Sequence, residues 1–126
     1  MTYRVETTSR FDREFKKLDF YTKRIIKSWE LEMKILAITQ ARYGSTRLPA
    51  KILKKVNGMT LLEIHLRRIL QSKLISKLKV ATTNEEGAGY IVAVADKLGV
   101  ECYKGSVDDV LERFYKAAEP ECPDYV

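Results

Sequence analysis

The sequence predicts an α/β fold, with a parallel β-sheet formed by residues 33–126 and a β-α-α extension in front of it. Short apolar runs alternate with amphipathic helical patterns in the order strand, helix, strand, helix, strand, helix, strand. Right-handed crossovers join such strands into a parallel sheet. The first apolar run also leads directly into a basic loop, residues 40–51, at the edge where parallel sheets bind ligands.

The first strand and the first helix of the sheet domain flank this loop. Residues 33–38, Met-Lys-Ile-Leu-Ala-Ile, form a short and mostly apolar run of the kind found in central parallel strands. After the loop, residues 60–63, Thr-Leu-Leu-Glu, have the pattern of a capping box, and apolar residues follow at helical spacing. The sequence therefore predicts a strand over 33–38 and a helix that continues to about Ser72.

Further strands and helices follow in alternation. Strands are predicted over residues 79–83 and 100–103, separated by a helix that ends at Gly99. The next helix begins at residues 106–109, and two prolines mark its end. Residues 124–126 have the pattern of a fourth strand that has just begun, and an exposed edge on that strand would favour a homodimer.

The first 32 residues follow a different pattern. A strand over residues 3–7 is followed by two amphipathic helices, which begin near Ser9 and Asp19. This β-α-α pattern predicts an N-terminal segment, residues 1–32, that is distinct from the main domain, residues 33–126.

Length and composition fit one small soluble domain. The chain has 126 residues, of which 45% are hydrophobic, and this is enough for a single core. No apolar run reaches the roughly 18 residues of a membrane span, and the N-terminus lacks the apolar stretch of a secretory signal. We therefore expect a cytoplasmic protein without a membrane partner. Cys102 and Cys122 lack a CxxC spacing and are expected to be free thiols, so no metal ligand is assigned.

The charge of the chain is concentrated in one segment. The net charge is +6, but residues 33–79 alone carry +10, while residues 80–126 carry −6. A nucleic-acid-binding surface would spread its basic residues more evenly. A basic block beside an acidic one favours a local anion site, although a solvated helix face explains part of it. Nucleic acid is therefore not the expected partner.

The loop after the first strand has the composition of a phosphate site. Arg42, Arg47 and Lys51 surround the small residues Gly44 and Ser45, which let backbone amides turn toward an anion. Arg offers a fork of donors to a phosphate, and Lys offers a point charge. The loop contains neither GxGxxG nor GxxxxGK followed by Ser or Thr, which argues against a dinucleotide cofactor and against a P-loop NTPase.

The same loop resembles the N-terminal signature of sugar-activating nucleotidyltransferases. Residues 40–51, Gln-Ala-Arg-Tyr-Gly-Ser-Thr-Arg-Leu-Pro-Ala-Lys, are similar to the cytidylyltransferase group that includes CMP-KDO synthetase and, more closely, the spore-coat polysaccharide biosynthesis protein F family. The resemblance continues through residues 57–58, 80–83 and 105–114. It covers about residues 33–126 and implies a Rossmann-like sheet of the nucleotide-diphospho-sugar transferase type.

The resemblance implies a reaction and a set of site residues. A sugar oxygen attacks the α-phosphorus of CTP, pyrophosphate leaves, and a CMP-sugar forms for polysaccharide biosynthesis, with Mg²⁺ sharing the phosphate charge. The protein mainly positions and neutralises the reactants. Arg42 and Lys51 would have the catalytic roles, and Thr82 and Thr83 would line the base or ribose side. The implied nucleotide-binding residues are Gln40, Ala41, Arg42, Gly44, Ser45, Arg47, Lys51, Thr82, Thr83 and Arg113.

Each of these residues also has a structural alternative. The three basic loop residues could be solvated charges, and Thr82 and Thr83 could be ordinary β-branched strand residues. Asp108 and Asp109 are expected to act as charges at a helix N-terminus. Arg113 is either part of a helix-surface ion pair or a ligand contact.

Two features differ from the family pattern. Family members continue with a strand and a turn whose Asp binds the metal, followed by the sugar-binding part, whereas this chain ends at Val126. The principal Mg²⁺ ligand and the acceptor site are therefore expected beyond the chain end, and turnover by this chain alone is not implied. In addition, residues 84–89 read Asn-Glu-Glu-Gly-Ala-Gly where paired acidic residues are common, and the glycines weaken the expected helix start.

Residues 1–32 resemble the start of RelE/ParE-type toxins, which are small ribosome-dependent mRNA interferases. The resemblance covers only the front of such a domain, without the strands that carry the RNA-cleaving residues. The alternatives to the nucleotidyltransferase are therefore a toxin-like fragment and a non-enzymatic RNA- or protein-binding module. The expected role of residues 1–32 is that of an amphipathic extension that packs on the main domain or on a second chain.

Overall fold

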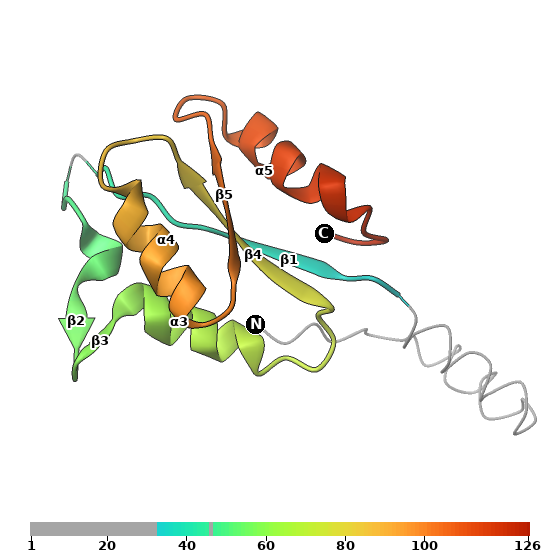
Figure 1. Ribbon diagram of the computed structural model, residues 1–126, viewed down its shortest axis with the longest axis horizontal. Helices are drawn as coiled ribbons and strands as arrows, with labels where there is room; N and C mark the ends of the chain where they lie inside the picture. Colours follow the sequence, from blue (N-terminus) through green and yellow to red (C-terminus); the bar gives the residue numbers. More distant parts are fainter. Residues whose placement is uncertain (1–32, 46) are drawn as a thin grey trace, which may run out of the picture. The chain divides into compact units, whose positions relative to one another are not determined.

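The computed structural model describes residues 33–45 and 47–126. The predicted β-α-α extension and the toxin resemblance fall on residues 1–32, outside the described residues, and stay predictions. Lys34–Val126 form one compact unit. Its elements, shown in Figure 1, are β1 Leu36–Gln40, η1 Lys51–Leu53, β2 Lys55–Val56, β3 Met59–Thr60, α3 Leu61–Leu70, β4 Lys77–Thr83, α4 Ala88–Lys97, β5 Glu101–Gly105, α5 Val110–Ala118 and η2 Glu119–Glu121.

Strands β1, β4 and β5 form a parallel sheet with β4 in the centre. The carboxyl end of β4, Thr83, pairs with Gly105 of β5. After α5 the chain returns to the other side of β1, where Tyr125 forms an isolated parallel bridge with Ile35. The chain thus runs from β1 outward to β5 and then comes back across β1. Parallel sheets bind ligands at such a reversal point, outside the carboxyl ends of the strands.

Helices cover both faces of this sheet. Between α3, α4 and the sheet lies a core of buried apolar residues, Ala41, Leu62, Leu66, Leu78, Val80, Ile91, Ala95 and Val100. Strand side chains alternate between the faces, so Lys79 points to the other face, where its Nζ donates to the carbonyl of Ala117 in α5 at 3.1 Å. Figure 1 shows α5 separated from α3 and α4 by the sheet.

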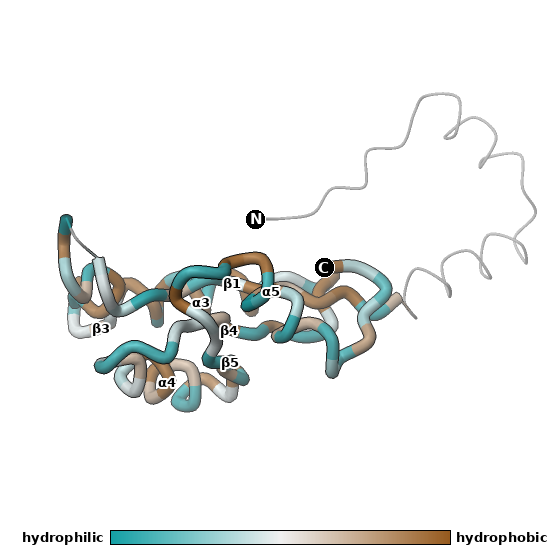
Figure 2. Tube along the Cα trace, turned by 90° about the horizontal axis from the view of Figure 1, so that it is seen from above, coloured by the Kyte–Doolittle hydropathy of each residue, from teal (hydrophilic) through white to brown (hydrophobic). Residues whose placement is uncertain are grey.

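The helices begin and end close to the predicted positions. The Oγ1 of Thr60 accepts a hydrogen bond from the backbone N–H of Glu63 at 3.1 Å, which is the predicted N-cap of α3. The carboxylate of Glu63 does not return to the backbone N–H of Thr60, as a complete capping box requires. It accepts hydrogen bonds from the side chains of Arg67 and Lys97 instead. Gly99, with φ 70°, follows the end of α4. Helix α4 carries both hydrophobic and hydrophilic residues (Figure 2), and no helix among the described residues is long and apolar enough to cross a membrane.

The predicted α/β class with a parallel sheet is confirmed, while several boundaries differ. Strand β1 begins at Leu36 rather than Met33 and continues to Gln40, because its register with β4 covers those residues. The sequence analysis missed the hairpin formed by β2 and β3. Its turn, residues 57–58, is Asn-Gly with φ 51° and 81°, and this pair is typical of a type I′ turn. The predicted fourth strand is present only as the bridge at Tyr125.

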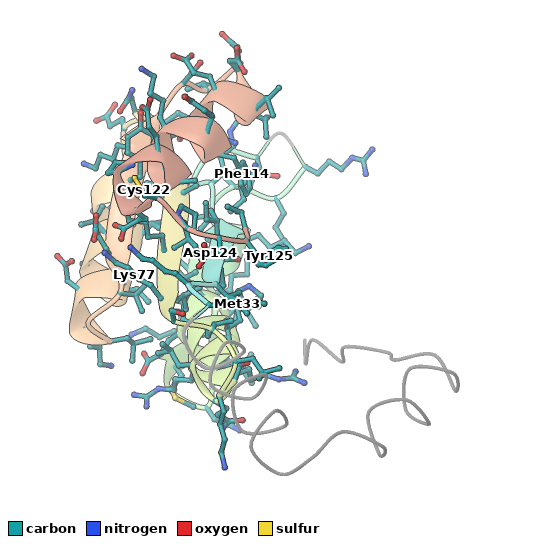
Figure 3. All side chains as sticks on the ribbon, turned by 90° about the vertical axis from the view of Figure 1, so that its right-hand side faces the viewer. Met33, Lys77, Phe114, Cys122, Asp124 and Tyr125 are labelled. Carbon is teal, nitrogen blue, oxygen red and sulfur yellow. The ribbon has the colours of Figure 1, made fainter. Side chains whose placement is uncertain are left out.

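A buried ammonium group ties the C-terminal segment to the amino end of the sheet. Lys79 is 2% exposed, and its Nζ lies 2.8 Å from Glu121 and 3.1 Å from Glu101. Lys77 pairs with the same two carboxylates. Hydrogen bonds from Lys77 and Lys79 lower the pKa of Glu121 to about 2. Lys77 and Tyr125, both labelled in Figure 3, belong to this end of the sheet, which is opposite to the edge with the basic loop.

The core between α3, α4 and the sheet predicts a large cost for truncating Leu66, which is 0% exposed. We expect Leu66→Ala to lower the free energy of unfolding by about 2–5 kcal/mol, because it removes buried methyl groups and leaves a cavity. Leu74→Ala is the matched control, since Leu74 is 48% exposed, and it should stay within about 0.5 kcal/mol. Urea unfolding followed by circular dichroism measures both, and equal losses would contradict this description of the core.

Candidate functional site

The loops that follow β1, β4 and β5 lie at the same edge of the sheet. Backbone hydrogen bonds continue the ladder just past the strand ends, from Ala41 N to the carbonyl of Ala81 and from Asn84 N to the carbonyl of Gly105, both at 3.1 Å. The first residues of the loops after β1 and β4 are therefore fixed to the neighbouring strands. The backbone positions of the next residues, Arg42 and Glu85, are thereby defined at the carboxyl edge.

A charged hydrogen-bond network joins the loop after β1 to the loop after β4. The guanidinium of Arg42 donates from Nε to Glu85 Oε2 at 3.0 Å and from Nη2 to Glu85 Oε1 at 2.9 Å. The hydroxyl of Thr83 donates to Glu85 Oε2 at 2.6 Å. A fork of two parallel N–H donors on one carboxylate is the strongest geometry that Arg offers. The two loops are thus held together by one carboxylate.

Gly44 lies directly against this carboxylate. A Cβ atom at Gly44 would be 2.5 Å from Glu85 Oε1, so a side chain at this position would displace the carboxylate from its place beside the loop backbone. The pKa of Glu85 is lowered to about 2, first by the hydrogen bond from Arg42, then by that from Thr83, with a smaller contribution from the backbone of Gly44. The same contact with Glu85 raises the pKa of Arg42, and Asp108 adds to this rise. Arg42, Glu85 and Asp108 therefore interact electrostatically at one edge of the sheet.

The other predicted phosphate-binding residues lie on the exposed part of the loop. Arg47 and Lys51 are exposed, and neither side chain has an acidic partner in the part of the chain that the structure describes. Ser45 Oγ accepts a hydrogen bond from the backbone N–H of Leu48 at 3.3 Å and so shapes the loop from within. The structure brings Arg42, Gly44 and Thr83 around Glu85, while Arg47 and Lys51 keep their charges in solvent.

Thr82 and Thr83 are both fully buried. Thr83 faces the network and donates to Glu85, whereas the hydroxyl of Thr82 has no hydrogen-bond partner. Gln40 and Ala41, at the end of β1, were also predicted to bind the nucleotide. Gln40 is exposed, and Ala41 is buried in the core. In this structure the threonine side chains therefore act through Glu85 or within the core and do not present a surface to solvent.

Arg113 is also buried, at 1% exposure. Its Nη1 donates to the carbonyl of Ser106 at 2.6 Å, and its Nε has no partner. The aliphatic part of the side chain packs over Gly105, where a Cβ atom would be 2.9 Å from its Cγ. Arg113 is thus not part of a helix-surface ion pair. It holds the loop between β5 and α5, at the carboxyl end of the sheet.

The two aspartates before α5 have different positions. Asp109 is the N-cap of α5, and its Oδ1 accepts from the backbone N–H of Glu112 at 2.8 Å, as the expected helix N-terminal role requires. Ser106 Oγ in turn accepts from the backbone N–H of Asp109 at 3.1 Å. Asp108 is exposed and contributes the electrostatic effect on Arg42 described above.

Next to the network lies an open groove of about 640 Å³, lined by Tyr43, Glu86, Gly87, Gly89 and Tyr90. The rings of Tyr43 and Tyr90 are stacked, with centroids 6.0 Å apart and planes at 25°. Gly87 has φ 91°, and a Cβ atom there would be 2.5 Å from the ring of Tyr43. The glycine that appeared to weaken the helix start is therefore required by the close approach of this ring.

Sequence reasoning missed Glu85 as a member of the site. Its position just past the end of β4 was a usable signal, because the carboxyl ends of adjacent parallel strands meet at one edge. The sequence cannot indicate which of Glu85 and Glu86 faces the loop after β1. In the structure Glu85 does so, and Glu86 lines the groove instead.

No metal cage is present among residues 33–45 and 47–126. They contain no group of three or more His, Cys, Asp or Glu side chains arranged to hold a metal ion. At the carboxyl edge, the carboxylate of Glu85 is already satisfied by Arg42 and Thr83. The described residues therefore form no cage that would hold a metal ion by protein side chains alone.

Comparison with known proteins gives consistent matches over the sheet domain. A family model described as "Cytidylyltransferase" matches residues 36–124. The uncharacterized protein MJ1063 of Methanocaldococcus jannaschii is 45% identical over 87 residues, which are 69% of this chain and 36% of that protein. The spore coat polysaccharide biosynthesis protein SpsF of Bacillus subtilis is 38% identical over 96 residues, which are 73% of this chain and 40% of that protein. The chain thus spans less than half the length of these relatives.

Solved structures match the same part of this chain, and again over less than half of their own length. A cytidylyltransferase from Leptospira borgpetersenii is 37% identical, with a TM-score of 0.67, over 71% of this chain and 38% of that chain. A CMP:2-keto-3-deoxy-manno-octonic acid synthetase in complex with CTP is 24% identical, with a TM-score of 0.60, over 75% of this chain and 38% of that chain. The latter match supports the fold alone, which is that of nucleotide-diphospho-sugar transferases.

The network predicts a specific acid sensitivity. Because the pKa of Glu85 falls from its usual 4.5 to about 2 on folding, its contribution to stability is complete above the unfolded pKa and is lost as the pH falls toward 2. We expect the wild-type chain to be more stable than Glu85→Gln at about pH 6, and this difference to shrink toward about pH 2.5. Urea unfolding of both chains across this range measures it. A difference that is constant with pH would show that Glu85 is not held as a paired carboxylate.

Proposed function

We propose that this chain, which belongs to the cytidylyltransferase family, binds the triphosphate of CTP through the loop of residues 40–51. The nucleotide would be the donor in a transfer of its cytidylyl group to a sugar. Because the chain spans 36% and 40% of the length of its first two relatives, both the complete activity and the sugar acceptor belong to the proposal.

One observation carries the proposal: the loop that the family motif marks holds a guanidinium in a fixed orientation at the carboxyl edge of the sheet. Arg42 is paired through Nε and Nη2 with Glu85, which also accepts from Thr83. An oriented guanidinium beside a loop with small residues is an arrangement that can bind a phosphate. Arg47 and Lys51, whose charges are exposed on the same loop, supply the additional positive charge that a triphosphate requires.

The proposed chemistry is a single displacement at the α-phosphorus. The sugar oxygen forms a bond to this phosphorus and loses its proton to solvent, the bond from the α-phosphorus to the oxygen that bridges to the β-phosphorus breaks, and pyrophosphate leaves. The basic loop would hold the β- and γ-phosphates and neutralise the charge that develops on the leaving pyrophosphate. Positioning and electrostatic stabilisation then account for the contribution of these residues, and no covalent enzyme intermediate is needed.

Mg²⁺ enters this proposal only as a companion of the nucleotide. In nucleotide sites the ion binds mainly to phosphates and water, with one or two protein carboxylates. The described residues offer no cage for it, so no role of a residue in this proposal depends on the ion.

The names of the relatives indicate a sugar acceptor. SpsF is named for polysaccharide biosynthesis, several relatives are 3-deoxy-manno-octulosonate cytidylyltransferases, and one similar structure holds CTP. We therefore propose an acidic or neutral sugar of a surface polysaccharide as acceptor and the cytoplasm as the compartment of the reaction.

Binding of CTP tests the proposal directly. We expect CTP to raise the melting temperature of the chain and to shift NMR signals of residues 40–51. Arg47→Ala and Lys51→Ala should each weaken CTP binding by about tenfold, because each removes a charged hydrogen bond to phosphate. Lys73→Ala is the matched control, since Lys73 is also exposed but precedes β4 at the other end of the sheet. If CTP changes neither the melting temperature nor the NMR spectrum, the proposal is wrong.

A further inference from the structure

We propose that Glu85 is a positioning residue of the nucleotide site, which holds the guanidinium of Arg42 in place to receive a phosphate. This inference rests on the proposed function, because it assigns a role to Glu85 in the same site. The loop motif of residues 40–51 does not include Glu85. The assignment follows from the contacts around its carboxylate.

The network runs from the core to the surface as a chain of fixed groups. Thr83 is fully buried and donates its hydroxyl hydrogen to Glu85 Oε2. The side chain of Glu85 is 23% exposed, and that of Arg42, at the outer end, is 43% exposed. Each group is oriented by the one beneath it. A flexible arginine side chain is therefore fixed by contacts that begin at a buried residue at the carboxyl end of the central strand.

The geometry leaves part of Arg42 available for a ligand. Its Nε and Nη2 donate to Glu85, and Nη1 donates to no acceptor among the described residues. A guanidinium has five N–H donors in a rigid plane, so a side-on pair with a carboxylate fixes that plane and leaves the remaining donors free. A phosphate that approaches the exposed side meets a donor group that is already oriented, and less side-chain entropy is lost on binding.

Glu85 also sets the course of the loop backbone. Its Oε1 lies so close to Gly44 that a Cβ atom built on Gly44 would be only 2.5 Å from this oxygen. Gly44 is two residues beyond Arg42 and precedes the exposed cations of the loop. One carboxylate thus positions both the guanidinium and the loop backbone that follows it.

The alternative role for Glu85 is that of an internal competitor, which a triphosphate would displace. The contacts favour positioning. Both carboxylate oxygens are already satisfied, and moving Glu85 away would leave the buried hydroxyl of Thr83 without its acceptor. Leaving a buried donor unpaired is costly. A competitor that is easily displaced would not be tied to a buried group in this way.

A double-mutant cycle on Arg42 and Glu85 tests the inference, with binding of CTP and of inorganic tripolyphosphate measured by calorimetry. We expect Glu85→Gln to weaken the binding of both probes by roughly three- to tenfold, a typical coupling for groups in direct contact. In the Arg42→Ala background, the same substitution should weaken binding clearly less, since Glu85 acts mainly through Arg42 and only its contact with the loop backbone at Gly44 remains. Glu85→Asp, whose shorter side chain cannot span Arg42 and Thr83 together, should weaken binding in the wild-type background as well.

Glu101→Gln is the matched control, because Glu101 is likewise a carboxylate paired with basic side chains, but at the amino end of the sheet. It should leave binding unchanged. Tighter binding by Glu85→Gln would show a competitor and overturn the inference. Equal weakening in both backgrounds would show a general structural effect and also overturn it. If the wild-type chain binds neither probe, the proposed function fails and the positioning role fails with it, whereas binding by the wild type without an effect at Glu85 contradicts the positioning role alone.

Discussion

The structure depends on the central strand β4, which is hydrogen-bonded to a parallel strand on each side and covered by helices on both faces. A polar group on such a strand is costly unless it finds a partner inside the protein, because water has no access to it. From Leu78 to Thr83 each residue of β4 is buried. The few polar side chains that it carries therefore decide which other segments are held against it.

These polar side chains divide the sheet into two ends with different roles. At the amino end, Lys79 draws Glu101, Glu121 and the end of α5 toward it, and this fixes the segment that leads to Tyr125. At the carboxyl end, Thr83 supports Glu85, which holds the loop that carries Arg42. The ion pairs at the amino end hold the C-terminal segment against the sheet. The ion pair at the carboxyl end holds the loop of the candidate site in position. The acidic second half of the chain thus meets the basic first half at both edges.

The sequence was sufficient for the fold class and for the position of the basic loop at the carboxyl edge of the sheet, because both follow from local patterns. Apolar runs and helix caps predicted the alternation of strands and helices, and the basic loop follows the first strand of that alternation. Side-chain partners were not predictable. Arg113 lies in an amphipathic pattern that fits a surface position as well as a buried one, and its burial depends on the absence of a side chain at Gly105. The sequence alone presents Gly87 as a residue that weakens a helix start. The structure shows that the ring of Tyr43 occupies the space that a side chain at this position would need.

The pairing of Arg42 changes how the charge of the basic loop should be understood. Glu85 neutralises Arg42 locally, and Asp108 lies within electrostatic range of it, so this corner alone has little excess positive charge to attract a triphosphate. Long-range attraction must come from the exposed cations, among them Arg47 and Lys51. In the proposed function, Arg42 would contribute direction rather than charge, because its donors are fixed before a ligand arrives. The cations of the loop would then have separate roles, with some attracting the phosphates and one orienting them.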